Sequence, residues 1–278
     1  FEAAAAQAGL VVAAARDFAA WDAHPQARAL VTLPTVSITP IVDTERAAAA
    51  APIAWSTAPS SAPPLHGLRV LDLTRILAGP VAGRTLAAYG ADVMLLNSPE
   101  LPNIESIADT SRGKLSAFVE LKNEAGRAAL RGLIGESRVF MQGYRPGALA
   151  ALGFGPADVA RLRPGIVYVS LSAYGAVGPW ANRRGFDSLV QTATGFNLAE
   201  AQAFEASQPR AMPLQVLDYA AGYLLAFGAQ AALLRQAQQG GSWHVQVSLA
   251  GVGHWLRSLG RVARAQPEPA SNHDECLE

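Results

Sequence analysis

The chain has 278 residues, of which 50% are hydrophobic and 16% charged, so it is expected to be globular with a sizeable core rather than disordered. Lysine plus arginine equals aspartate plus glutamate at 22 each, so no overall charge attracts the chain to nucleic acid or to a membrane surface. The single cysteine, Cys276, excludes an internal disulfide and favours a reducing, cytoplasmic setting. The five histidines lack metal-ligand spacing, so no metal site is expected.

The first residue is Phe1 rather than methionine, and Glu2, Arg16 and Asp17 interrupt the apolar start, so no signal peptide is evident. We interpret the sequence as a fragment or a processed form of a longer protein. Residues 1–42 form the first predicted unit.

Within this first unit the patterns predict a helix, a short strand over residues 10–14, a second helix capped by Asp17, and an exposed strand pair over residues 30–42. Residues 43–64 are rich in alanine, proline and serine and are interpreted as a linker. A large domain is expected over residues 65–264. A polar, disordered tail is expected over residues 265–278.

Strands and helices alternate along the large domain, a pattern typical of an α/β fold with a mainly parallel sheet. Ligands of such sheets bind beyond the carboxyl ends of the strands, so the loops that follow the strands are the expected walls of a site. Strands are predicted over residues 68–73, 91–96, 117–121, 138–141, 165–171 and 243–249. Helices are predicted over residues 81–89, 123–135, 148–152, 156–162 and 214–239, with a last helix ending near residue 264.

The helix over residues 214–239 has no charge between Asp218 and Arg235, which predicts burial on nearly all sides. It is judged too short and too polar at its ends for a membrane span. Asp218 stands at its start. One interpretation makes Asp218 the N-cap of the helix, because aspartate is a preferred cap. The other makes it a rigidly aimed nucleophile or acid–base group. The two interpretations are compatible.

Familiar cofactor and catalytic motifs are missing. The first strand–helix loop reads Gly79-Pro-Val-Ala-Gly83 instead of G-x-G-x-x-G, and the second strand ends at Asn97 rather than at an acidic residue, which disfavours NAD or FAD. There is no phosphate-binding P-loop and no G-x-S-x-G motif, and residues 67–243 contain no histidine, which disfavours a Ser-His-Asp hydrolase. The loops do carry arginines that suit a phosphate-bearing ligand, although each alone is expected to be a solvated surface residue. These arginines are Arg75, Arg145, Arg183 and Arg184.

Several blocks follow one another in unbroken order over residues 65–257, among them LRVLDLTRILAGPVAG, QGYRPGALAALGF, RRGFDSLVQ and VLDYAAGYLLAFG. Together they resemble the class III CoA-transferase family, which includes formyl-CoA and carnitine-CoA transferases and α-methylacyl-CoA racemases. The resemblance implies the large domain of that family, a Rossmann-like, mainly parallel sheet flanked by helices. It also implies transfer of coenzyme A between an acyl-CoA and a carboxylic acid, with acyl-CoA as a substrate and no permanently bound cofactor.

By the same resemblance, Asp218 is the catalytic aspartate, which forms an anhydride and then an aspartyl-CoA thioester. The racemases add a histidine in a G-H-D block, but here Phe186 stands in that position and cannot exchange a proton, so a transferase is favoured over a racemase. Asp187 is expected to order its loop rather than to react. The residues matching the family's coenzyme A contacts are Arg75, Ile76, Leu77, Ala78, Val119, Gly143, Tyr144, Arg145, Arg184 and Phe186.

The chain also departs from the family pattern. The family often has an acidic and then a basic residue where this chain has Asn97 and Ser98, so one contact to the nucleotide is expected to be lost. Leu115 stands where the family has an arginine. The family's smaller lid domain is not found. Residues 1–42 instead resemble the family's C-terminal end and are expected to complete the edge of the sheet. A homodimer, or association with a missing second domain, is implied. The rival hypothesis is a non-catalytic acyl-CoA-binding subunit.

Overall fold

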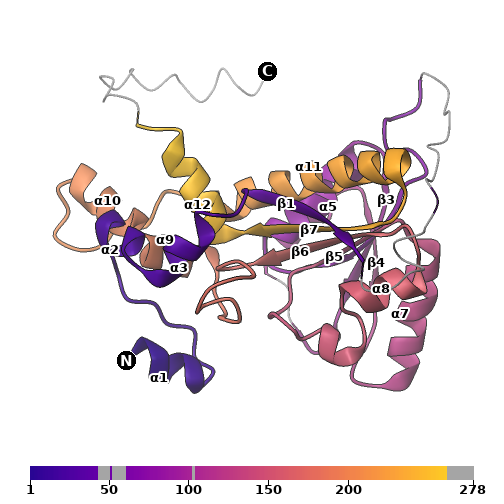
Figure 1. Ribbon diagram of the computed structural model, residues 1–278, viewed down its shortest axis with the longest axis horizontal. Helices are drawn as coiled ribbons and strands as arrows, with labels where there is room; N and C mark the ends of the chain where they lie inside the picture. The colour runs from indigo at the N-terminus through magenta and orange to yellow at the C-terminus, as the bar shows by residue number, and fades with distance from the viewer. Residues whose placement is uncertain (43–50, 52–60, 102–103, 262–278) are drawn as a thin grey trace.

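A computed structural model describes residues 1–42, 51, 61–101 and 104–261, so the predicted tail and most of the predicted linker lie outside the described residues. The described chain forms a seven-stranded sheet with helices on both faces (Figure 1). The strands are β1 (Val36–Ile41), β2 (Arg69–Leu73), β3 (Asp92–Asn97), β4 (Lys114–Phe118), β5 (Val139–Gln142), β6 (Val167–Ser172) and β7 (Ser242–Ser248).

The strand order is β1-β7-β6-β5-β2-β3-β4, and every neighbouring pair from β7 to β4 is parallel. From β4 to β7 this is the order of a dinucleotide-binding fold, in which the chain direction across the sheet reverses between β2 and β5. The predicted fold class, α/β with a mainly parallel Rossmann-like sheet, is therefore confirmed.

Two hydrophobic layers enclose the sheet. On one face α5 (Ala78–Ala88) and α11 (Val216–Gln239) cover the strands, with Val70, Val169 and Val245 beneath them. On the other face α7 (Glu124–Glu136) and α8 (Pro156–Leu162) form a second cluster on Leu71, Phe140 and Tyr168. Alternate residues of each strand thus serve opposite layers.

Helices α5 and α11 approach each other closely at Gly222. A methyl group on Gly222 would lie 2.6 Å from the carbonyl oxygen of Ala78 and 2.7 Å from a methyl of Val81. Both helices run antiparallel to the parallel strands, because α5 follows β2 and α11 precedes β7. Both therefore begin beyond the carboxyl ends of the strands, where helices α9 (Asp187–Thr194), α10 (Phe196–Ala203) and α12 (Leu249–Ser258) also lie (Figure 1).

The N-terminal segment joins this sheet. β1 pairs antiparallel with β7, with Ile38 opposite Val245, which confirms the expectation that residues 1–42 complete the sheet edge. The predicted strand pair over residues 30–42 is wrong, since one strand forms there. Its Pro40 is tolerated because β1 is an edge strand.

Before β1 lie the short helices α1 (Glu2–Gln7), α2 (Phe18–Asp22) and α3 (Pro25–Leu30). Asp17 caps α2 as predicted, accepting a 2.7 Å hydrogen bond from the N–H of Ala20. The predicted strand over residues 10–14 does not form. Ala14 donates its N–H to the Glu2 carboxylate at 2.9 Å instead of to a neighbouring strand.

Some boundaries in the large domain also differ from the predictions. β4 begins at Lys114, three residues before the predicted start, and α5 begins at Ala78 rather than near residue 81. Helices α9 and α10 and the short α6 (Ile107–Thr110) were not predicted from the sequence. The helix predicted over residues 148–152 is a 3-10 turn, η1 (Ala150–Leu152).

Helix α11 is 24 residues long and apolar enough to cross a membrane by length and composition, so the prediction that it is too short is wrong. Of its most apolar 18 residues, 56% are buried inside the fold. It packs on the sheet and on α5 as the core helix of this domain.

We predict that Gly222→Ala lowers the free energy of unfolding by about 1–3 kcal/mol, because the added methyl group collides with the backbone of α5. The matched control is Gly132→Ala in α7, where no atom lies within 4 Å of an added methyl group. That variant should gain roughly 0.5–1 kcal/mol from its higher helix propensity. Urea denaturation measures both. Equal behaviour of the two variants would contradict the close helix contact.

Candidate active site

Asp218 lies in the first turn of α11, and its side chain is 7% exposed. It is not the N-cap. That position belongs to Gln215, whose side chain makes no capping hydrogen bond. The N-cap interpretation of Asp218 is therefore wrong, and the carboxylate is left available for other contacts.

A different carboxylate binds the start of α11. The Asp187 side chain, 1% exposed at the start of α9, accepts a 2.8 Å hydrogen bond from the backbone N–H of Asp218 and a further one from the N–H of Leu217. These N–H groups have no partners within α11, so Asp187 satisfies them from outside the helix. Negative charge at this end is also favoured by the helix dipole. Asp187 thus orders more than its own loop.

Gln191 holds Asp187 in place. It stands one turn further along α9 and donates its amide N–H to the Asp187 carboxylate. The same amide group donates to the carbonyl of Leu214 at 3.2 Å, and its oxygen accepts from the N–H of Met212 at 3.1 Å. Helix α9 therefore fixes both the first turn of α11 and the segment that leads into it.

Burial, and then the negative charge of Asp187, raise the pKa of Asp218 from 3.8 to about 7. Burial also raises the pKa of Asp187, while the N–H groups of Asp218 and Leu217 and the amide of Gln191 oppose that rise. A carboxylate that ionises near neutral pH is more basic and more nucleophilic than an ordinary one. Such shifted groups concentrate at functional sites.

The loop after β2 is shaped by a fully buried ion pair. Lys114 Nζ lies 2.8 Å from Asp72 Oδ2 and donates to the carbonyl of Pro80 at 2.8 Å. The other oxygen of Asp72 accepts the N–H of Thr74 at 3.0 Å. Asp72 is therefore a structural residue, and its partner Lys114 is the first residue of β4, which the sequence did not reveal.

Within this loop Ile76 has a φ of 73°, in the left-handed region that a β-branched residue rarely adopts. Residues forced into such conformations often lie at ligand sites. Leu77 and Ala78 follow, both buried, and Ala78 touches α11 at Gly222, one helical turn beyond Asp218. The start of α5 therefore lies on the same side of α11 as the Asp218 turn.

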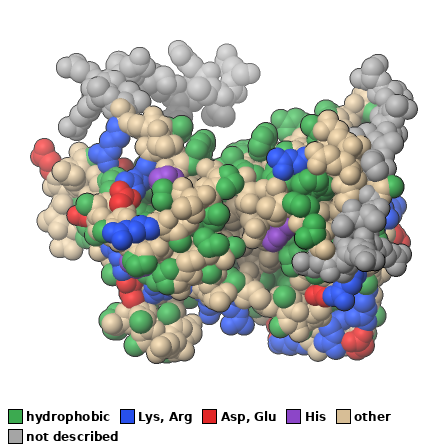
Figure 2. All heavy atoms as spheres, viewed as in Figure 1, with side chains coloured by type: hydrophobic (Ala, Val, Ile, Leu, Met, Phe, Trp, Pro, Cys, Tyr) green, Lys and Arg blue, Asp and Glu red, His purple; other side chains and the backbone are tan. Residues whose placement is uncertain are grey.

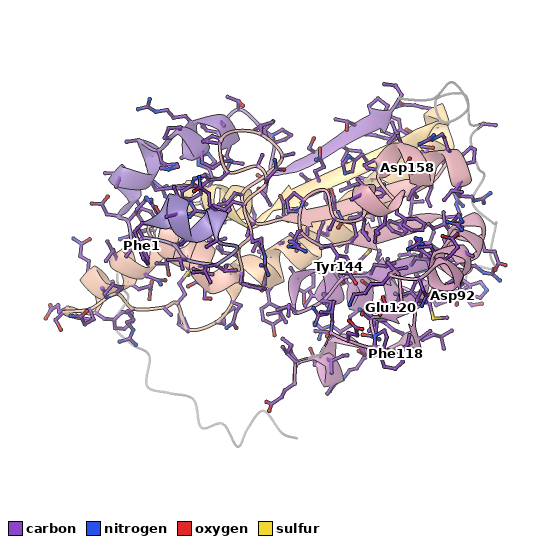
Figure 3. All side chains as sticks on the ribbon, turned by 90° about the horizontal axis from the view of Figure 1, so that it is seen from below. Phe1, Asp92, Phe118, Glu120, Tyr144 and Asp158 are labelled. Carbon is purple, nitrogen blue, oxygen red and sulfur yellow. The ribbon has the colours of Figure 1, made fainter. Side chains whose placement is uncertain are left out.

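A second group of predicted residues lies near the carboxyl ends of β2 and β5, where the strand order reverses. Burial raises the pKa of the Tyr144 phenol, while the nearby charge of Arg75 lowers it and that of Glu120 raises it. Val119, next to Glu120, donates its N–H to the carbonyl of Asn97 at 2.9 Å and packs, like Tyr144, on the hydrophobic cluster beneath α7. In Figure 3 Tyr144 and Glu120 lie close together.

The turn after β5 completes this corner. Gly143 has no side chain, and a methyl group there would lie 4.0 Å from Cβ of both Thr74 and Leu171, so the turn passes between the loop after β2 and the end of β6. Arg145 follows and is exposed.

Arg145 and Arg184 line a different hollow, of about 820 Å³, whose other wall comes from α1 and the residues after it. Arg184 donates to the carbonyl of Gly9 at 3.2 Å, and the Arg183 guanidinium lies 4.2 Å from the centre of the Trp180 ring. Phe186 is 45% exposed beside Asp187.

The structure therefore brings the predicted residues together in three places rather than one: around Tyr144, around Arg145 and Arg184, and at the start of α5. Asp218 lines neither the hollow beside Arg145 nor the small cavity beside Arg75. Within the described part of the chain, no group of three or more metal-ligand side chains gathers.

Residues 65–272 match the sequence model of CoA-transferase family III. The chain belongs to this family. It is 34% identical over 233 residues to a probable fatty acyl-CoA transferase of Mycobacterium tuberculosis, Rv3272, covering 76% of this chain and 59% of that protein. It is 33% identical to a succinate–glutarate CoA-transferase of Agrobacterium fabrum, covering 70% of this chain and 53% of that protein.

Solved structures agree. A crystal structure of Rv3272 superposes with a TM-score of 0.62 at 34% identity, covering 71% of this chain and 58% of that one. A CAIB/BAIF family protein from Brucella suis superposes with a TM-score of 0.60 at 27% identity, covering 70% of this chain and 56% of that one. The chain thus spans somewhat more than half the length of these relatives.

We predict that Asp218→Asn raises the free energy of unfolding at pH 8. The folded-state pKa lies above the unfolded value of 3.8, so the wild-type carboxyl group loses stability as pH rises from about 4 to about 7. Asparagine stays neutral and avoids this loss, a gain on the order of 2–4 kcal/mol at pH 8 that disappears near pH 4.

Denaturant titrations at several pH values measure this gain. The control is Asp92→Asn, which removes an exposed carboxylate from β3. A gain that did not vary with pH would show that Asp218 carries no raised pKa.

Proposed function

We propose that Asp218 is the nucleophile of a coenzyme A transferase that exchanges coenzyme A between an acyl-CoA and a carboxylic acid. The observation that carries this proposal is the Asp218 carboxylate itself, buried, tuned to ionise near pH 7 and fixed by Asp187 at the start of a core helix. Membership of CoA-transferase family III supports it. Covalent catalysis by a carboxylate suits this exchange because it divides one difficult transfer into easier steps.

In the first half-reaction an oxygen of Asp218 attacks the thioester carbonyl. The carbon–sulfur bond breaks, leaving a mixed anhydride and the free coenzyme A thiolate. The thiolate then attacks the side-chain carbonyl carbon of Asp218, which releases the donor carboxylate and forms an aspartyl-CoA thioester. The acceptor carboxylate reverses both steps and regenerates the carboxylate of Asp218. No net proton transfer is required.

Coenzyme A is proposed to follow the loops between β2 and β5, where ligands of this sheet topology bind. Arg75 and Tyr144, with Val119 beside them, suit the nucleotide end, because arginine pairs with phosphate and an aromatic ring stacks on adenine. The segment from Ile76 to Ala78 leads from there to the side of α11 that carries Asp218. Arg145, which follows Gly143 in the turn after β5, and Arg184 offer further positive charge, and Phe186 precedes Asp187.

We also propose that the chain works as a homodimer in the cytoplasm. The outer side of α11 exposes large apolar side chains at helical spacing: Tyr223 is 53% exposed, Phe227 61% and Leu234 54%. Such a stripe is typical of a protein–protein contact. The single cysteine fits a reducing compartment.

A second candidate is a non-catalytic subunit that binds acyl-CoA. The 7% exposure of Asp218 favours it, because a nucleophile must reach its substrate. Trapping the covalent intermediate separates the two candidates.

The protein incubated with succinyl-CoA and hydroxylamine should acquire a hydroxamate at Asp218, since hydroxylamine attacks both the anhydride and the thioester. Peptide mass spectrometry reads out the modification. Asp218→Ala must remain unmodified there, and Asp92→Asn should be modified like the wild type. An unmodified wild type that still binds the acyl-CoA in calorimetry would favour the non-catalytic subunit.

A second prediction concerns pH. Asp187→Asn removes the negative charge that helps raise the pKa of Asp218, so the acid limb of kcat/KM should move to lower pH. The asparagine oxygen can still accept one N–H from α11. The control is Ser188→Ala, an exposed neighbour on α9, whose profile should match the wild type. An acid limb that stayed in place, or moved to higher pH, would contradict the assigned coupling.

A further inference from the structure

The sheet face opposite α11 carries a row of polar side chains on three neighbouring strands. Ser37 projects from β1, His244 and Gln246 from β7, and Ser170 from β6, where Gln246 is the partner of both Ser37 and Ser170 in the strand register. Strands covered by helices on both faces are ordinarily apolar on both. This part of the sheet therefore does not have the surface that a packed helix requires.

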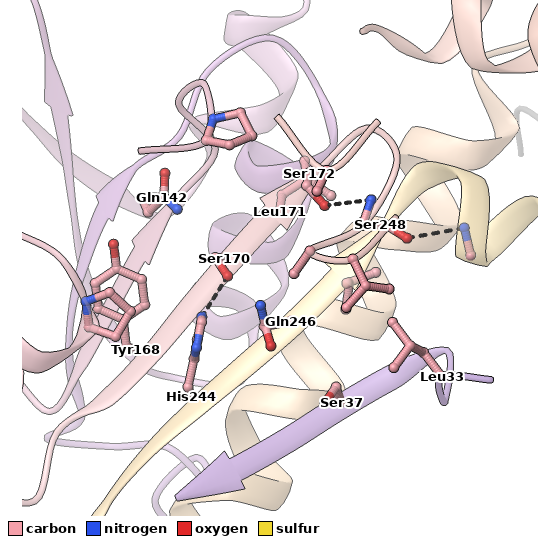
Figure 4. A pocket seen from close by; sticks show the side chains of 18 of the residues that line it. Leu33, Ser37, Gln142, Tyr168, Ser170, Leu171, Ser172, His244, Gln246 and Ser248 are labelled. Atoms are coloured by element: carbon pink, nitrogen blue, oxygen red, sulfur yellow. Dashed lines mark hydrogen bonds between the residues drawn. The ribbon is translucent and has the colours of Figure 1, made fainter. Parts of the chain in front are cut away.

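These side chains form the floor of a cavity of about 270 Å³ (Figure 4). Its walls come from residues 30–35, from the turn after β5 that contains Arg145, and from the loop after β6, and they are largely apolar. In Figure 2 the surface near the centre of the view consists mainly of hydrophobic and uncharged side chains, with histidine among them.

The floor is polar but uncharged. His244 Nε2 lies 2.7 Å from Ser170 Oγ, and burial lowers the pKa of His244 to about 4, so the ring is neutral near pH 7. The Gln246 amide makes no hydrogen bond with the described part of the chain, although it is half-buried. A half-buried amide without a partner offers hydrogen bonds to a ligand.

The mouth of the cavity is positively charged. Arg145 is exposed there, and no carboxylate of the described residues lies within salt-bridge distance of it. Neither aspartate nor glutamate lines the cavity. An anionic group is therefore favoured at the mouth, and an uncharged hydrogen-bonding group at the floor.

We propose that this cavity binds a hydroxylated monocarboxylic acid, with its carboxylate at Arg145 and its hydroxyl group at Gln246 and the Ser170–His244 pair. Its aliphatic body contacts the apolar walls. The site lies on the opposite side of the sheet from α11, so it is separate from Asp218, although it shares Arg145 with the proposed path of coenzyme A.

The test is a titration of the 278-residue chain, ¹⁵N-labelled at histidine, with 6-hydroxyhexanoate. The His244 ring signals, assigned with His244→Gln, should shift and saturate at about millimolar ligand. Hexanoate lacks the hydroxyl group and 1,6-hexanediol lacks the carboxylate. Both should bind more weakly, the diol by at least about tenfold.

Two variants locate the contacts. Gln246→Leu should reduce the affinity for 6-hydroxyhexanoate to that for hexanoate while leaving hexanoate binding unchanged. Arg145→Gln should reduce it to that for the diol. If Gln246→Leu fails to fold by circular dichroism, Ser170→Ala replaces it.

Failure to saturate up to about 20 mM ligand, a diol that binds as tightly as the acid, or variants without effect would each overturn the proposal. Asp218→Ala should bind 6-hydroxyhexanoate like the wild type. The inference and the proposed transferase activity can therefore fail independently.

Discussion

The hydrogen bonds from the first turn of α11 to the Asp187 carboxylate are the constraint on which the candidate active site depends. They tie the long core helix to α9, a helix from a different part of the chain, and they set the position of Asp218. The same carboxylate places negative charge next to Asp218 and so contributes to its raised pKa. Burial is the larger cause of the raised pKa, and Asp187 adds to it while fixing the position of Asp218. An uncharged cap would fix the helix without adding this charge effect.

A second constraint, a buried ion pair, fixes the loop after β2. The buried pair of Asp72 and Lys114 connects β2 to β4 across β3, and it holds the loop that contains the left-handed Ile76. Removing one partner of such a pair leaves an uncompensated charge, which ordinarily costs about 3–5 kcal/mol. A rigid loop next to a rigid helix start is the kind of preorganisation that a covalent mechanism needs. The same buried charges therefore stabilise the fold and fix the loop of the proposed site.

Much of the fold could be predicted because the strands β2, β3 and β5 and the helix α11 are strongly apolar and are bounded by glycine or cap residues. Predictions failed where a side chain, rather than the backbone of a neighbouring strand, provides the hydrogen-bond or ion-pair partner. The apolar run over residues 10–14 looks like a strand, but Glu2 takes the N–H of Ala14. β4 starts earlier than predicted because its first residue, Lys114, is polar and still fully buried by its ion pair.

The candidate site was less accessible to sequence reasoning. Asp218 could be singled out from the sequence, but Asp187 lies 31 residues before it, and no local pattern connects the two. The i, i+4 spacing of Asp187 and Gln191 was the available signal, since it places an acid and an amide on one helix face. The sequence indicated the pocket above Gln246 only through the alternation of polar and apolar residues along β7. That alternation is equally typical of an exposed strand face.

The way in which the first forty residues are attached has a consequence for how the polypeptide can be divided. Gln26 is fully buried and joins the segment to the loop after β6: its amide donates to the carbonyls of Tyr174 at 2.7 Å and Val177 at 2.8 Å. Asp22 pairs with Arg257 of α12 at 2.7 Å, and β1 adds its ladder to β7. These contacts hold residues 1–42 against the sheet and α12. The fold therefore depends on where this segment lies and not on the point at which it is joined to the rest of the chain.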